Sequence, residues 1–247
     1  MLKKFLLADL LKMKGSSVAL AHLLIPILTS GLFLAYYSIS IWDENTKVIA
    51  FYQAVGAGFP ALIGIFTACI MEQEQNAGEC QNLLALHRKT ATFLSKLFLL
   101  LLCSLFSVFL TTVLFGFGFC KILGNRTVSM ENCLIAALLL WCSSIPLYVW
   151  QIILAFHFGK GISIGMGIVS GLVSALMLTN LGTFIWKYTP VSWTARIPYT
   201  YWQGILGESY AILEMKSAIL IYGIFTMFSM VYYGMWASHW EGSKISE

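Results

Sequence analysis

The chain is poor in charged side chains. Only 11% of its 247 residues are Asp, Glu, Lys or Arg, whereas about a quarter of the residues in a soluble domain are charged. This shortfall excludes an ordinary soluble fold, because a surface exposed to water needs charged groups. No Asp, Glu, Lys or Arg occurs in residues 15–42, 48–71, 97–120, 132–159, 161–186 and 217–240. Since roughly 20 helical residues cross a bilayer core, the sequence predicts six transmembrane helices.

The predicted fold class is an all-α integral membrane protein with one transmembrane domain over residues 1–247. We expect the spans at about residues 17–41, 48–71, 96–119, 133–157, 161–184 and 217–239. In residues 1–14, Asp9, Lys12 and Lys14 interrupt any apolar run that a cleaved signal peptide would need. This basic segment is therefore expected to lie along the membrane surface as an interfacial helix.

Lysine and arginine, which favour the cytoplasmic side of a membrane protein, predict the orientation. If the N-terminus lies inside, nine of these residues fall on inner segments and six on outer ones. We therefore expect both termini in the cytoplasm, together with the polar segment of residues 71–96. The net charge of +4 follows from this topology, and the lack of a basic soluble face argues against binding of nucleic acid.

Several motifs of catalysis and metal binding are missing from the sequence. No Gly-x-x-x-x-Gly-Lys-Ser/Thr loop occurs, so the chain itself has no visible means of hydrolysing ATP. Neither a Cys-x-x-Cys pair nor a His-Glu-x-x-His motif is present, and we expect no metal or other bound cofactor. Cys120 and Cys133 flank the second outer loop and form either a disulfide or, as we expect, two unpaired thiols at helix ends.

The stretch GISIG, residues 161–165, matches the Gly-x-Ser-x-Gly pattern of serine hydrolases, in which Ser163 would be the nucleophile and a histidine its base. That pattern needs a strand-to-helix turn, whereas Ser163 lies in a predicted membrane helix. A packing role is the other interpretation, because small residues at every fourth position let two helices approach closely. These residues are Ser163, Gly167, Gly171 and Ala175. Their partner is a helix of this chain or of a second subunit.

The third predicted outer segment, residues 184–216, is rich in Trp and Tyr, which favour the headgroup layer of a membrane. We expect most of these rings to anchor the chain at the interface. The segment is longer than a turn requires, so we also expect it to offer a surface to an amphipathic peptide or lipid that arrives from outside. The candidate contact residues are Trp186, Trp193, Arg196, Tyr199 and Trp202.

The segment of residues 71–96 is strongly polar, although apolar stretches flank it on both sides. Two acids follow the last apolar residue of the second span, and Gly78 then acts as a helix breaker. Beyond Gly78, apolar residues recur with helical spacing. We predict a turn and a short amphipathic helix that lies on the inner lipid surface or docks into a groove of a soluble partner. The candidate residues are Glu72, Glu74, Gly78, Gln81, Leu83, Leu84, His87 and Arg88.

At these residues the sequence resembles the permeases of ABC-2 transporters, in which an acidic, glycine-containing end of the second span leads into a leucine-bearing coupling helix. The matching positions are Glu72, Glu74, Gly78, Leu83 and Leu84. A proline of many members is replaced here by His87 and Arg88. Two stretches look like the lantibiotic-immunity permeases of Gram-positive bacteria: AGECQNLLALHRKTATFLSKLF, residues 77–98, and PVSWTARIPY, residues 190–199.

The resemblance implies a transport subunit with no enzymatic activity of its own, in the bacterial cell membrane. Such a permease pairs with a second related permease, or a second copy of itself, and with two copies of a separate ATPase that binds ATP and Mg. The complex expels a lantibiotic and thereby gives immunity, with the coupling helix seated on the ATPase. The alternatives are a permease for another amphipathic peptide or a lipid, and an intramembrane serine hydrolase that uses Ser163.

Overall fold

The computed structural model describes residues 2–13, 15–78, 80–84, 89–124 and 128–242, and within these ranges it contains helices and no strand. The helices are α1 (Leu2–Met13), α2 (Ser17–Ile39), α3 (Glu44–Asn76), α4 (Gln81–Leu84), α5 (Lys89–Lys121), α6 (Met130–Phe158), α7 (Lys160–Met177), the 3-10 turns η1 (Asn180–Gly182), η2 (Trp186–Tyr188) and η3 (Pro190–Ser192), α8 (Trp193–Ile205) and α9 (Ser209–His239).

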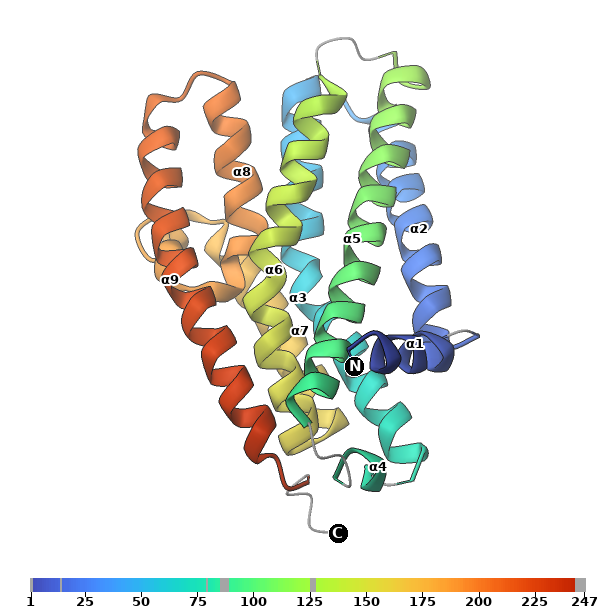
Figure 1. Cartoon of the computed structure of the whole chain (residues 1–247). Coiled ribbons are helices and arrows are strands. Elements are labelled where there is room, and N and C mark those ends of the chain that lie inside the picture. The colour runs from blue at the N-terminus through green and yellow to red at the C-terminus, as the bar shows by residue number, and fades with distance from the viewer. Residues whose placement is uncertain (1, 14, 79, 85–88, 125–127, 243–247) are drawn as a thin grey trace.

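In the described part of the chain six helices are long and apolar enough to cross a membrane: α2, α3, α5, α6, α7 and α9. They run side by side as one bundle, and α1 lies across the bundle axis (Figure 1). This confirms the predicted class of an all-α membrane protein with six spans. The end of the bundle that carries α4 is called the α4 end below, and the opposite end, where α8 meets α9, is called the α8 end.

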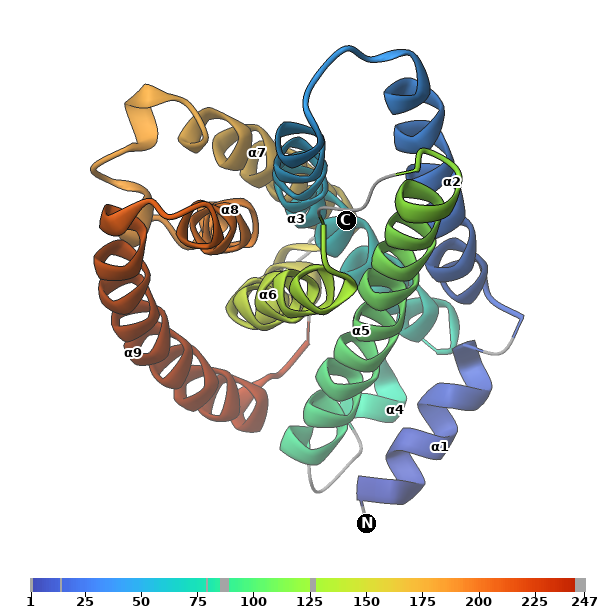
Figure 2. The same cartoon turned by 90° about the horizontal axis from the view of Figure 1, so that it is seen from above.

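Helices α3 and α6 occupy the middle of the bundle, as the view along its axis shows (Figure 2). They are also the spans with the largest buried share. Helix α3 packs most extensively on α7 and also contacts α6 and α8, whereas α2 packs mainly on α5. Helix α3, which leads into α4, therefore contacts helices on several sides of the bundle.

Small residues explain the close packing of α7 on α3. A Cβ atom on Gly64 of α3 would lie only 2.7 Å from the Cα of Gly167 on α7. Gly171 faces the same helix, where its Cβ would lie 3.2 Å from the Ala57 carbonyl oxygen. The partner of the predicted small-residue stripe is thus α3 of the same chain, although Ala175 at the end of that stripe is exposed.

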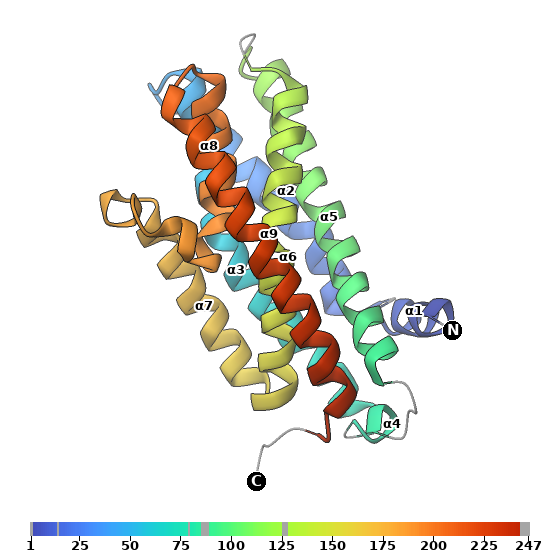
Figure 3. The ribbon, with the colours of Figure 1, turned by 60° about the vertical axis from the view of Figure 1, so that its left-hand side comes forward.

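The fifth span is shorter than predicted, because α7 ends at Met177 rather than at residue 184. There the chain folds back so tightly that a Cβ on Gly182 would lie 2.1 Å from the Met177 carbonyl oxygen. Three 3-10 turns follow and lead into α8. Figure 3 shows these turns beside the bundle, with α8 continuing toward the far end. The aromatic segment predicted to follow the fifth span is therefore largely helical.

Candidate functional site

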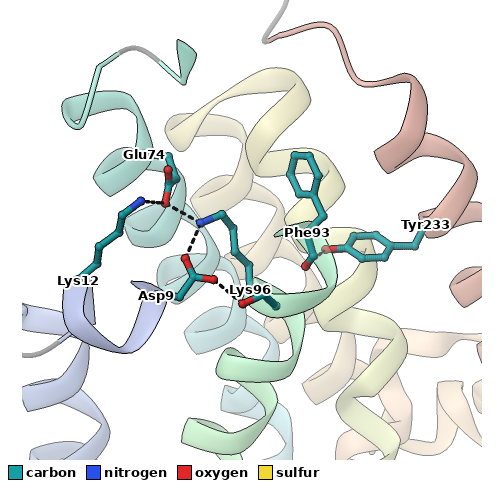
Figure 4. Close-up of polar contacts among 7 residues, drawn as sticks. Asp9, Lys12, Glu74, Phe93, Lys96 and Tyr233 are labelled. Atoms are coloured by element: carbon teal, nitrogen blue, oxygen red, sulfur yellow. Dashed lines mark hydrogen bonds and ion pairs between the residues drawn. The ribbon is translucent and has the colours of Figure 1, made fainter. Parts of the chain in front are cut away.

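Four charged side chains meet near the α4 end of the bundle, and we call them the charge network: Asp9, Lys12, Glu74 and Lys96 (Figure 4). The Lys96 Nζ donates to Glu74 Oε1 at 2.5 Å and to Asp9 Oδ1 at 3.1 Å. Lys12 Nζ donates to the same Glu74 oxygen at 2.7 Å, and the Ser95 hydroxyl donates to Asp9 at 2.6 Å. The network joins α1, α3 and α5.

Because the network is buried, each of its charges would destabilise the protein if it lost its partner. The side chains of Lys96 and Glu74 are only 2% and 3% exposed, whereas Lys12 reaches the surface. A buried charge that loses its partner destabilises a protein by about 3–5 kcal/mol, because little solvent is available to replace that partner. Two cations face two carboxylates here, so each of the four charges has an opposite charge in contact. The arrangement favours one docked position of α1 on α3 and α5.

Glu74 also connects this network to the predicted coupling segment through its backbone. Its carbonyl oxygen accepts a hydrogen bond from the Cys80 N–H at 3.2 Å. Between these two residues α3 ends, and the chain reverses at Gly78, whose φ is 120°. Cys80 has a φ of 62° and leads directly into α4. Glu74 therefore bonds to the turn before α4 through its backbone, and to Lys12 of α1 and Lys96 of α5 through its side chain.

The structure changes the expected role of one leucine of the coupling segment. Leu83 is 4% exposed and belongs to the core of this chain, so its side chain is not open to a partner. Gln81, on the first turn of α4, is exposed. His87 and Arg88 lie outside the described residues, as does the side chain of Leu84. Gln81 is therefore the described candidate of α4 that faces outward.

Further contacts at the α4 end join the remaining spans. Lys160 at the start of α7 pairs with Glu72 of α3 at 2.6 Å. Lys89 at the start of α5 donates to the Trp240 carbonyl oxygen beyond α9 at 2.8 Å. The Tyr233 hydroxyl of α9 donates to the Phe93 carbonyl oxygen of α5, also at 2.8 Å (Figure 4). Helices α1, α3, α5, α7 and α9 thus share contacts around the entry and exit of α4.

Three of the predicted contact residues in the aromatic segment are inside the protein. The indole rings of Trp186, Trp193 and Trp202 are at most 2% exposed. They are buried because η2, η3 and α8 fold back against α3, α6, α7 and α9, so the expected open surface is wrong for these three rings. Tyr199 is half-buried, and a direct contact of any of these residues with cargo stays a prediction.

Arg196, the fourth of those predicted residues, binds the end of α7. Its Nε donates to the Met177 carbonyl oxygen at 2.6 Å and its Nη2 to the Thr179 carbonyl oxygen at 3.0 Å. The Met177 carbonyl at the C-terminus of α7 lacks a partner within that helix and carries partial negative charge, whereas the Thr179 carbonyl also accepts from the Gly182 N–H at 3.0 Å. Burial lowers the pKa of the Arg196 guanidinium, yet arginine stays protonated in proteins. The residue therefore fastens α8 to the end of the short span.

Ser163 lies in a packing contact, and none of its partners among the described residues could act as the base of a hydrolase. The side chain is buried, and its described hydrogen-bond partners are the Gly64 carbonyl oxygen at 3.0 Å, the Thr67 hydroxyl at 3.0 Å and Gln151 Oε1 at 3.3 Å. None of these three groups can take a proton from a serine as a histidine does. The described contacts of Ser163 therefore fit the packing interpretation rather than the alternative of a nucleophile.

Cys120 and Cys133 are free thiols in the described part of the chain, so the expectation of unpaired cysteines fits the structure better than a disulfide. The charge network itself was not predicted, although its members stand in the sequence. The available signal was Asp9, a single acid among lysines, together with Lys96 at the edge of an apolar stretch. The spacing of Asp9 and Lys96 in the sequence does not indicate that their side chains are in contact.

The fold and the charge network define a multi-pass α-helical membrane protein in which buried charges join α1, α3 and α5 close to α4. A family model described as ABC-2 family transporter protein matches residues 5–174, more than half of the chain. The chain therefore belongs to the ABC-2 transporter family. It is a transport subunit of an ABC transporter, and this membership implies association with an ABC ATPase subunit. No curated protein and no solved structure matches the chain.

Proposed function

We propose that the chain is the permease subunit of an ATP-driven transporter that expels a lantibiotic, or a similar amphipathic antimicrobial peptide, from the bacterial cell membrane. Family membership supports the permease role. The peptide as cargo is supported by the likeness of residues 77–98 and 190–199 to lantibiotic-immunity permeases. In the complete transporter two copies of the ATPase act on this chain and on a second permease, which is a related protein or a second copy.

The observation that carries the coupling mechanism is the double role of Glu74. Its carbonyl oxygen binds the turn before α4, and its carboxylate binds Lys12 and Lys96. In the proposed orientation the α4 end faces the cytoplasm, where α4 contacts the ATPase. Closure of the ATPase then moves α4, and the bonds of Glu74 carry that movement to α1 and α5.

A cellular assay tests the proposed cargo. The chain is expressed in a lantibiotic-sensitive Gram-positive host together with its partner ATPase and the second permease. We expect the lowest lantibiotic concentration that stops growth to rise several-fold, and labelled peptide to leave the cells. An ATPase variant that binds but does not hydrolyse ATP serves as the control. Unchanged sensitivity to a panel of lantibiotics, in cells that assemble the complex, would reject the peptide as cargo.

A further inference from the structure

A cavity of about 320 Å³ lies between α2 and α3, away from the charge network and from α4. Helices α5 and α6 contribute to its walls. It exists because α2 packs on α5 and makes few contacts with α3, and Figure 2 shows the separation of α2 from α3. Along α2 the lining runs from Ala21 to Phe33, which corresponds to about 18 Å of helix. The cavity is therefore long and narrow.

One end of the cavity is lined by His22, whose ring holds a buried and unpaired nitrogen among the described residues. His22 is 4% exposed, and its ring stacks on Phe66 with 4.0 Å between the ring centroids. Its Nδ1 lies 2.8 Å from the Val18 carbonyl oxygen, which can only accept, so Nδ1 carries the hydrogen. The Nε2 atom has no hydrogen-bond partner among the described residues. In the neutral ring this nitrogen accepts a hydrogen bond.

The other polar side chains that line the cavity carry hydroxyl groups: Thr29, Ser104, Ser107, Thr111 and Tyr148. The hydroxyls of Ser104, Ser107 and Thr111 donate to backbone carbonyl oxygens of Leu101, His22 and Ser107. The Tyr148 hydroxyl on α6 lacks a partner within the described ranges. No acidic or basic side chain other than His22 is found among the described residues that line the cavity. Apolar side chains form most of the remaining wall.

These features indicate which kind of molecule fits the cavity. His22 is five residues beyond the start of α2, or about 8 Å along the helix, and so lies at the end of the cavity nearer α1. The apolar wall extends from there past the middle of α2 to Phe33. A hydrocarbon chain with a hydroxyl at its head matches this polarity. A helical peptide is about 10 Å wide and does not fit this narrow space.

We propose that this cavity binds one hydrocarbon chain of a membrane lipid that carries a glycerol hydroxyl, with the hydroxyl donating to His22 Nε2. His22 lies in the first half of α2, about 8 Å from the start of that helix, so a glycerol group at the near edge of the bilayer would reach its ring. The chain lies between α2 and α3. This inference does not depend on which cargo the transporter expels, because it concerns binding to the permease alone.

The chain offers a matched pair of glycines for the test. A Cβ added to Gly58, which lines the cavity, meets no atom of the described residues within 4 Å, and the same holds for Gly31 on α2, which is exposed and does not line it. Gly58→Leu therefore fills the cavity without a backbone clash. Gly31→Leu adds the same side chain elsewhere. A third variant, His22→Phe, keeps a ring beside Phe66 and removes the acceptor.

The experiment is a titration of the purified full-length chain in detergent, followed by native mass spectrometry. The probes are monoolein, which has glycerol hydroxyls, and methyl oleate, which has the same chain and no hydrogen-bond donor. We expect one monoolein per chain in wild type and Gly31→Leu, and at least about tenfold weaker binding in Gly58→Leu. In His22→Phe the preference for monoolein over methyl oleate, about five- to tenfold in wild type, should disappear.

Helix content and thermal unfolding confirm that each variant is folded before binding is compared. Equal monoolein binding by wild type and Gly58→Leu would overturn the proposal, as would an unchanged preference for monoolein in His22→Phe. Displacement of monoolein by a lantibiotic peptide, with the peptide's own binding lost in Gly58→Leu, would also overturn the lipid assignment and assign the cavity to the cargo.

Discussion

At the scale of single residues, the buried carboxylate of Glu74 determines much of the architecture near α4. A carboxylate that is 3% exposed persists in a membrane protein only when cations and hydrogen-bond donors surround it. Lys12 and Lys96 provide the cations, one from the N-terminal helix and one from α5. The position of α1 across the bundle axis is therefore stabilised by charge pairing as well as by apolar contact.

Lys96→Met tests this dependence. The substitution leaves Asp9 and Glu74 buried with only Lys12 as a cation, so we expect a loss of about 3–5 kcal/mol in the free energy of unfolding. Unfolding by denaturant in mixed micelles measures the change. Lys121→Met, at the exposed far end of the same helix, is the control and should have little effect. Similar stability of the two variants would show that the network contributes little.

At the scale of elements, the contact between α3 and α7 depends on the absence of side chains. Gly167 faces α3 with its Cα close to Gly64, whereas Gly165 on the same helix has open space at the Cβ position among the described residues. The two glycines differ by half a turn of helix. They therefore separate the effect of helix propensity from the effect of packing.

Gly167→Ala should destabilise the protein by about 1–3 kcal/mol, because the new Cβ would lie 2.8 Å from the Gly64 Cα and the backbones must separate. Gly165→Ala should be neutral or stabilise the chain by up to about 1 kcal/mol, since alanine favours helix. Thermal unfolding of the two purified variants measures the difference. Equal unfolding temperatures would mean that the helices do not approach as closely as the structure has them.

The junction between α7 and α8 depends on Arg196. Lysine in its place keeps the charge but cannot form the same two-nitrogen contact with the Met177 and Thr179 carbonyl oxygens. We expect Arg196→Lys to cost about 1.5–3 kcal/mol locally. Hydrogen exchange in residues 178–192 should rise several-fold, with residues 17–39 unchanged as the internal control. Unchanged exchange in the junction would assign its order to other contacts.

At the scale of the whole molecule, the structure divides α4 into an inward and an outward side. Leu83 is packed in the core, and Gln81 is exposed. A change at Leu83 therefore mixes loss of stability with loss of coupling. A change at Gln81 isolates the contact with the ATPase.

Gln81→Arg should lower the stimulation of ATP hydrolysis by cargo at least about threefold in the reconstituted transporter while leaving the permease's unfolding temperature unchanged, because surface substitutions usually change stability little. Glu208→Gln alters the net charge by the same amount at the exposed α8 end and serves as the control. If both variants keep full stimulation, the partner does not contact this face of α4.

The sequence predicted the spans because a bilayer excludes charges, and their absence is visible over long stretches. It also predicted the turn at Gly78 from the residue type. The pairing of Asp9 with Lys96 could not be predicted from the sequence, because contacts between residues so far apart depend on how whole helices pack. The burial of Trp193 was missed for a related reason: amphipathic rings suit a membrane interface as well as a protein interior.

The short fifth span has a consequence for the lipid around the protein. With 18 residues, α7 is about 27 Å long, slightly less than the hydrophobic thickness of a typical bilayer. Beyond it, Phe184 and Tyr188 are 86% and 72% exposed on the turns that follow. A span shorter than the hydrocarbon layer thins the leaflets beside it. We therefore expect the bilayer to be slightly thinner on this flank of the protein, so that an amphipathic molecule would cross less hydrocarbon when it leaves the membrane there.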